Sequence, residues 1–100
     1  MATRRRRVVW SEQARVALDE AVAHVARDSP RAARRLLGIA LWTAAELEDL
    51  CERGRIVPEL DRATLHEVFI HPYRLLDEVT DSEVRVLAFL HDARDLGAPR

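Results

Sequence analysis

The sequence predicts a single α+β domain in which two helices are followed by a sheet. Apolar residues recur at three- and four-residue spacing between residues 11 and 53, which is the pattern of amphipathic helices. From residue 65 to residue 90 the spacing changes to two, the pattern of strands. A short β-branched and aromatic run, Val8–Trp10, comes before the helices and predicts one more strand. A chain of 100 residues has room for one domain, and we expect it to span residues 1–100 with flexible ends at about 1–6 and 95–100.

Composition excludes several classes of protein. With 48% hydrophobic and 33% charged residues, the chain is not intrinsically disordered. No apolar run reaches the roughly 20 residues of a membrane span, and the arginine-rich start lacks the apolar stretch of a signal peptide. A single cysteine, Cys51, cannot form an internal disulfide, which fits a reducing compartment. We therefore expect a cytoplasmic protein.

All 16 basic residues are arginines. Because arginine stays protonated at any useful pH, no lysine-like general base is available to this chain. The net charge of −1 also argues against binding nucleic acid through overall charge. The run Arg4–Arg7 is compatible with an anion-binding patch and with a solvated terminus that leads into an edge strand.

Two serines mark the expected helix starts. Ser11 is a typical N-cap, and Glu12 in the first turn suits the positive end of the helix dipole. Ser29 precedes Pro30, which is favoured at the first helical position. The apolar stripe of the first helix is mainly alanine, so a second helix can approach it closely. We expect the second helix to run from Pro30 to Arg53 and to close at Gly54, giving an antiparallel helical hairpin.

The second half of the chain predicts three strands after a loop at Gly54–Thr64. Pro72 and the pair Asp81-Ser82 separate them. The expected strands are Leu65–His71, Tyr73–Thr80 and Glu83–Leu90. In the last strand, one face is expected to carry Val84, Val86, Ala88 and Leu90, and the other Leu87 and Phe89. The order is β-α-α-β-β-β, a four-stranded, mainly antiparallel sheet with the hairpin on one face and with Leu65–His71 opposite in direction to the first strand.

Four segments of the chain resemble the RelE/ParE superfamily of type II toxins, and most closely its ParE branch. These segments read VVWSEQARVALDEAVAHVARDSPRAARRL, GRIVPEL, LHEVFIHPYRLLDEV and VRVLAFLHDARDL. Together they extend over nearly the whole chain, from Val8 to Leu96, and their order and spacing carry the likeness. The resemblance implies a small growth-inhibiting toxin that is neutralised by a cognate antitoxin in a hetero-oligomer, with no cofactor, no metal and no membrane.

Within this superfamily, ParE-like members are associated with inhibition of DNA gyrase and are not enzymes. The helical hairpin has the ParE character, lysine is absent, and Tyr73 is the only tyrosine, so none follows the last strand. These features favour a non-enzymatic, gyrase-directed toxin.

RelE-like members instead cut mRNA on the ribosome. Such a cut needs a base, an acid and cations for the phosphate charge. The resemblance places Glu59 as the base, Arg74 on the phosphate, His91 as the acid and Arg94 as a second cation.

Each of these residues also has a structural interpretation. Glu59 follows a proline and is typical of a solvated loop, and Arg74 could pair with Glu67 or Glu78 across neighbouring strands. His91 and Arg94 occur in a pattern that non-cleaving ParE-like members share.

Two positions depart from the family pattern. Asp77 stands where an aromatic residue is usual, and His66 stands where arginine is frequent. Both changes remove groups that the family presents on its sheet. They indicate a third alternative, a weakened toxin or a module that only binds antitoxins.

We expect the antitoxin to bind exposed apolar residues. Trp42 lies off the apolar stripe of the second helix, which suits an interface anchor, although a place in the core is the alternative. In the sheet, Phe69 and Leu76 alternate with Tyr73 and Leu75, so whichever set points away from the helices needs other cover. The expected partner-binding residues are Trp42, Phe69, Tyr73 and Leu76.

Overall fold

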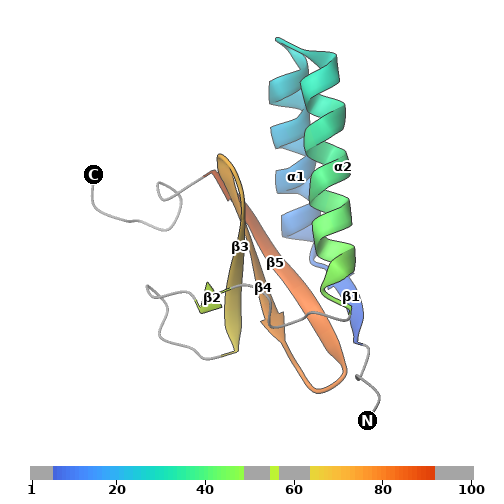
Figure 1. The fold of residues 1–100 in the computed structure, drawn as a ribbon, viewed down its shortest axis with the longest axis vertical. Coiled ribbons are helices and arrows are strands. Elements are labelled where there is room, and N and C mark those ends of the chain that lie inside the picture. The colour runs from blue at the N-terminus through green and yellow to red at the C-terminus, as the bar shows by residue number, and fades with distance from the viewer. Residues whose placement is uncertain (1–5, 49–54, 57–63, 92–100) are drawn as a thin grey trace, which may run out of the picture.

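A hairpin of two helices packs on one face of a mixed sheet (Figure 1). The computed structural model describes residues 6–48, 55–56 and 64–91. The helices are α1 (Glu12–Ala26) and α2 (Pro30–Glu46). The strands are β1 (Arg7–Trp10), β2 (Arg55–Ile56), β3 (Leu65–Ile70), β4 (Tyr73–Val79) and β5 (Glu83–His91). The predicted α+β class and the β-α-α-β-β-β order of the main elements are confirmed.

The sheet has the strand order β1-β5-β4-β3-β2. Three of its four strand pairs are antiparallel, as predicted, and β1 pairs with β5 in parallel. The edge strand β2 was not predicted, since residues 55–56 fall inside the expected loop. A strand of two residues has too few side chains to show a periodic pattern, so its formation depends on its partner β3.

The extra strand explains an error in the predicted strand direction. We expected residues 65–71 to run opposite to the first strand. Since β5 is parallel to β1, and β4 and β3 each reverse direction in turn, β3 runs the same way as β1. The short strand β2 is the one that runs opposite to β1 after the hairpin.

Both predicted helix N-caps are confirmed. The Ser11 hydroxyl accepts a hydrogen bond from the Ala14 N–H at 3.0 Å, and the Ser29 hydroxyl accepts one from the Ala32 N–H at 3.1 Å. Ser11 also ties α1 to the sheet, because its own N–H donates to the Val86 carbonyl of β5 at 2.9 Å. The cap therefore fixes both the start of α1 and its place on the sheet.

The second helix ends earlier than predicted, at Glu46 and not at Arg53. The Leu47 and Glu48 N–H groups donate to carbonyls three residues back, which tightens the last turn. The Glu48 carbonyl accepts the Arg6 N–H at 3.1 Å, so it is tied to the chain segment before β1. This tertiary contact holds the chain just after the helix end, and a helix pattern in the sequence does not reveal it. The predicted cap at Gly54 lies outside the described residues, as do residues 1–5 and 95–100 of the expected flexible ends. Arg6, which was counted in the first of these ends, is described and its backbone is hydrogen-bonded.

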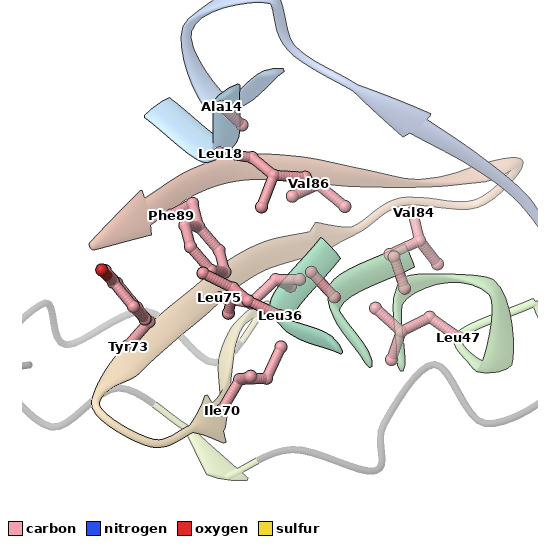
Figure 2. Packing of buried hydrophobic residues seen from close by; sticks show 12 residues of the cluster. Ala14, Leu18, Leu36, Leu47, Ile70, Tyr73, Leu75, Val84, Val86 and Phe89 are labelled. Carbon is pink, nitrogen blue, oxygen red and sulfur yellow. The ribbon is translucent and has the colours of Figure 1, made fainter. Parts of the chain in front are cut away.

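The main core lies between the hairpin and the sheet (Figure 2). Ala14 and Ala40 are fully buried, and such small side chains allow the helices to approach each other and β5 closely. Leu47, the C-cap of α2, and the strand residues Leu75 and Val84 are also completely buried in this cluster. Burial of each such side chain contributes on the order of 1.5–3 kcal/mol.

A β-bulge changes the two faces of β5. Leu76 pairs with Ala88 whereas Asp77 pairs with Val86, so Leu87 is an extra residue in the ladder. Leu87 lies on the predicted face, but from Ala88 onward the predicted faces were wrong. Phe89 joins Val84 and Val86 on the helix side. The other face carries a small cluster of Leu65 and Leu76, with Leu87, Ala88 and Leu90 against it.

Replacing Gly38 by alanine is expected to stabilise the fold. Gly38 lies in the middle of α2, and a Cβ there would meet nothing within 4 Å. Because glycine costs a helix about 0.8–1.0 kcal/mol relative to alanine, Gly38→Ala should raise the melting temperature by roughly 4–8 °C. Thermal melts followed by circular dichroism measure this. The matched control, Ala40→Gly at a fully buried position, should lower it, and a lower melting temperature for Gly38→Ala would contradict the account.

Candidate functional site

The structure describes two of the four residues expected for mRNA cleavage, Arg74 and His91. Arg74 pairs with Leu90 across the β4–β5 ladder, and His91 pairs with Tyr73. Since neighbouring residues of a strand point to opposite faces, Arg74 and His91 lie on different faces of the sheet. Glu59 and Arg94 lie outside the described residues.

Arg74 forms a buried ion pair within the sheet. Its Nη1 donates to Oε1 of Glu67 at 2.7 Å, and the two residues are 3% and 1% exposed. This is one of the two pairings that we expected from the sequence, with Glu67 as the partner. Separating such a pair leaves a buried charge without compensation, which costs about 3–5 kcal/mol. The guanidinium is therefore held by the fold before any phosphate could approach it.

His91 belongs to a short row of rings at the end of β5. Its imidazole meets the Tyr73 ring edge to face, with centroids 5.2 Å apart. Tyr73 in turn stacks on Phe89 at 5.0 Å. Tyr73 is buried in the core on the helix side. Little of this expected partner-binding residue is therefore exposed to a partner.

The two positions that depart from the family pattern meet in the structure. His66 of β3 and Asp77 of β4 are directly opposite each other in the ladder. Asp77 lies between Leu75 and Val79 on the strand, and both of those pack into the helix-side core, so Asp77 faces the hairpin. His66 is 8% exposed and Asp77 is fully buried. The His66 Nδ1 atom and both Asp77 carboxyl oxygens make no hydrogen bond.

Burial raises the pKa of Asp77 from 3.8 to about 7. The cause is desolvation, which disfavours the charged carboxylate. The folded protein thus holds this proton more tightly than the unfolded chain does. The contribution of protonated Asp77 to the free energy of unfolding is fully present below about pH 4. It is lost as the pH rises through about 7.

Replacing Asp77 by asparagine is expected to stabilise the protein above pH 7 and to flatten its pH dependence. Asparagine keeps the shape and cannot ionise, so it removes a penalty of up to about 4 kcal/mol, at about 1.4 kcal/mol per pKa unit. Denaturant melts of wild type and Asp77→Asn at pH 5 and pH 8 measure the difference. Asp81→Asn at the exposed β4–β5 turn is the control. An Asp77→Asn effect that is the same at both pH values would contradict this cause.

The face of the sheet away from the hairpin carries an apolar surface, which we call the open face. It consists of Leu65, Leu76, Leu87, Ala88 and Leu90, with Phe69 beside them. Phe69 is 52% exposed, whereas Leu76 is buried. Of the two alternating sets considered from the sequence, the one with Phe69 and Leu76 points away from the helices.

Trp42 is exposed on a different side of the molecule. It is 62% exposed on α2, which confirms the surface position and excludes the alternative in the core. The open face and Trp42 are separated by the sheet and the hairpin, so they are two distinct surfaces. Sequence periodicity could place each residue on a face of its own element but could not relate the two elements.

The described ranges show neither a cluster of three metal-ligating side chains nor a helix that is long and apolar enough to cross a membrane. Trp10, half-buried at the end of β1, lines three neighbouring cavities of about 240, 350 and 300 Å³. The sequence marked Trp10 as the end of a strand but gave no sign of the cavities beside it.

A known structure shares this architecture. It is described as the chromosomal ParDE TA system from P. aeruginosa, and its chain superposes with a TM-score of 0.73 over 89% of this chain and 98% of its own. The identity is 16%, so the likeness concerns the fold. No curated protein sequence matches this chain.

The sequence also matches a family model over almost its full length. Residues 8–96 fit the model described as the ParE toxin of the type II toxin-antitoxin system, parDE. This range includes the hairpin, the strands β3 to β5 and both departures at His66 and Asp77. The chain therefore belongs to the ParE family of type II toxins.

Proposed function

We propose that this ParE-family toxin inhibits growth without being an enzyme, by acting on DNA gyrase in the cytoplasm, and that a cognate antitoxin neutralises it. One observation carries the choice against mRNA cleavage. The Arg74 guanidinium is buried against Glu67, on the opposite face of the sheet from His91. Arg74 and His91, the two candidate nuclease residues that the structure describes, do not share a surface.

The gyrase proposal predicts a change in DNA supercoiling. Purified gyrase with excess toxin should lose supercoiling activity, while mRNA from cells that express the toxin should show no codon-positioned cuts in primer extension. Expression in cells without the antitoxin shows first whether the chain is toxic. Arrested growth is expected, whereas normal colonies would favour a homologue that only binds antitoxins. Arrested growth with unchanged supercoiling, or cuts at codon positions, would sink the gyrase proposal.

A double variant separates a structural from a catalytic role for Arg74. Arg74→Ala alone is expected to cost about 3–5 kcal/mol because Glu67 stays buried and charged. Glu67→Leu together with Arg74→Met replaces the pair by apolar side chains of similar size, which is often nearly neutral. We expect the double variant to melt near wild type and to arrest growth. A folded double variant without toxicity would point to chemistry at Arg74.

The open face is the surface that we assign to the antitoxin. Phe69 is its exposed aromatic residue and Leu76 lies within its cluster. Aromatic side chains beside apolar clusters are typical anchors of protein interfaces. A stable complex of this kind buries about 1,200–2,000 Å² in total. We expect the antitoxin segment that covers the open face to bury at least an area of this size.

Antitoxin binding is expected to raise the melting temperature, and Phe69→Ser should reduce that rise. At a thousandfold excess over the dissociation constant, binding stabilises the folded toxin by about 4 kcal/mol. Melting curves with and without the product of the neighbouring reading frame measure it. Val16→Ser, at a 46% exposed position on α1, is the matched control. The same assay with Trp42→Ala tests whether the antitoxin also reaches α2. Equal melting temperatures of the wild-type toxin with and without antitoxin would contradict the assignment of the open face.

A further inference from the structure

Four exposed arginines gather at the end of the helical hairpin, and we call this group the arginine tip. Arg27 is the C-cap of α1, and Arg31, Arg34 and Arg35 lie in the first half of α2. In Figure 1 this end of the hairpin projects beyond the sheet. Asp28 is the only acidic residue from residue 21 to residue 45, so this segment carries a net charge of +3 with histidine neutral, although the whole chain carries −1.

The fold makes no use of these four charges. In the part of the chain that the structure describes, no side chain of the arginine tip forms an ion pair or a hydrogen bond. By contrast, Arg7, Arg74 and Arg85 on the strands each lie beside a carboxylate. Arg31 also stands in the first turn of α2, where the partial positive charge of the helix N-terminus disfavours a cation. These guanidinium groups are therefore available to an anion from outside the chain.

We propose that the arginine tip binds the phosphate backbone of duplex DNA. A guanidinium group binds phosphate through two N–H groups at once, and the N-terminus of α2 adds its own positive dipole at the same place. Arg31 and Arg35 lie one turn apart, about 6 Å along α2, on the side away from the buried Leu36 and Ala40. Phosphates of one DNA strand follow each other at about 3.4 Å along the duplex axis. Long arginine side chains at this spacing can reach neighbouring phosphates.

The side chains around the arginines favour a duplex backbone over other anionic partners. Apart from the arginines, the exposed residues of the range 26–35 are Asp28, Pro30 and Ala32. A protein interface has an apolar core, and a single-stranded nucleic acid stacks its bases on aromatic rings. Residues 26–35 offer neither of these features. Contacts to phosphate alone carry no sequence information, so the binding is independent of base sequence.

The choice of DNA over double-stranded RNA rests on the proposed function, because gyrase works on duplex DNA. A toxin that is held on the same DNA as gyrase reaches its target at a higher effective concentration. The open face lies on the side of the sheet away from the hairpin, so it is separate from the arginine tip. An antitoxin segment on the open face therefore leaves the arginine tip uncovered.

Fluorescence anisotropy of a labelled DNA duplex, with the full-length toxin and without gyrase, tests the proposal. With about four phosphate contacts, the logarithm of the binding constant should fall against the logarithm of the salt concentration with a slope of about −3 to −4. Raising the salt from about 50 to about 200 mM should then weaken binding about a hundredfold. A second duplex with a different base sequence should bind equally well.

Single-charge variants locate the contact. Arg31→Gln should reduce the steepness of the salt dependence by about one, and the triple variant with Arg34→Gln and Arg35→Gln should weaken binding at least about tenfold. Arg15→Gln is the matched control and should leave binding unchanged. Arg15 is also exposed and without an ion pair in the described chain, and it lies about 18 Å from Arg27 along α1. The triple variant should melt no lower than wild type, since it removes a cation from the helix N-terminus.

Several outcomes would overturn the proposal. These are no DNA binding at low salt, equal losses in Arg31→Gln and Arg15→Gln, and stronger binding to an RNA duplex of the same length. Loss of antitoxin binding in the triple variant, without DNA binding in wild type, would assign the arginine tip to the antitoxin. The supercoiling assay judges the gyrase target separately. Gyrase inhibition without DNA binding would refute this inference alone, whereas DNA binding through the arginine tip without gyrase inhibition would refute the gyrase target alone.

Discussion

The contact of α1 with β5 determines which parts of this small protein are inside. Ala14 is completely buried there, and the Ser11 backbone N–H donates to Val86 of β5. Small side chains at this contact let the helix lie directly on the strand, so the larger residues of α2 and the sheet fill the space beside it. The hairpin covers one face of the sheet in this way. The cluster around Leu76 on the other face is left without a helix over it.

Buried polar groups on the two faces of the sheet have different surroundings. On the open side, Arg74 is paired with Glu67, because a guanidinium stays protonated and a buried cation needs a counter-charge. Under the hairpin, Asp77 faces His66 without a hydrogen bond to its carboxyl oxygens. A carboxyl group can take up a proton and become neutral, which is why its pKa rises to about 7. The first solution pairs a permanent positive charge with a counter-charge, whereas the second depends on the proton that Asp77 holds.

The parts of the fold that local chemistry decides were predictable from the sequence. Both serine caps and the hairpin follow from a few neighbouring residues, and the class follows from the change of period. The parts that distant contacts decide were not. The Arg6–Glu48 backbone bond holds the chain just after α2, and the bulge at Leu87 exchanges the faces of β5. For the site, the sequence offered Glu67 as a partner of Arg74, but only the strand register could place His66 opposite Asp77.

The position of Asp77 changes how a departure from the family pattern can affect toxicity. A residue on the surface would alter binding to the target directly, whereas a residue under the hairpin alters the fraction of folded toxin. The proposed antitoxin complex would add about 4 kcal/mol at saturating partner, an amount similar to the penalty of ionising Asp77 at neutral pH. Within the complex the two effects offset each other. The cost of Asp77 is therefore felt mainly by toxin that has left its antitoxin, which is the form that would act on a target.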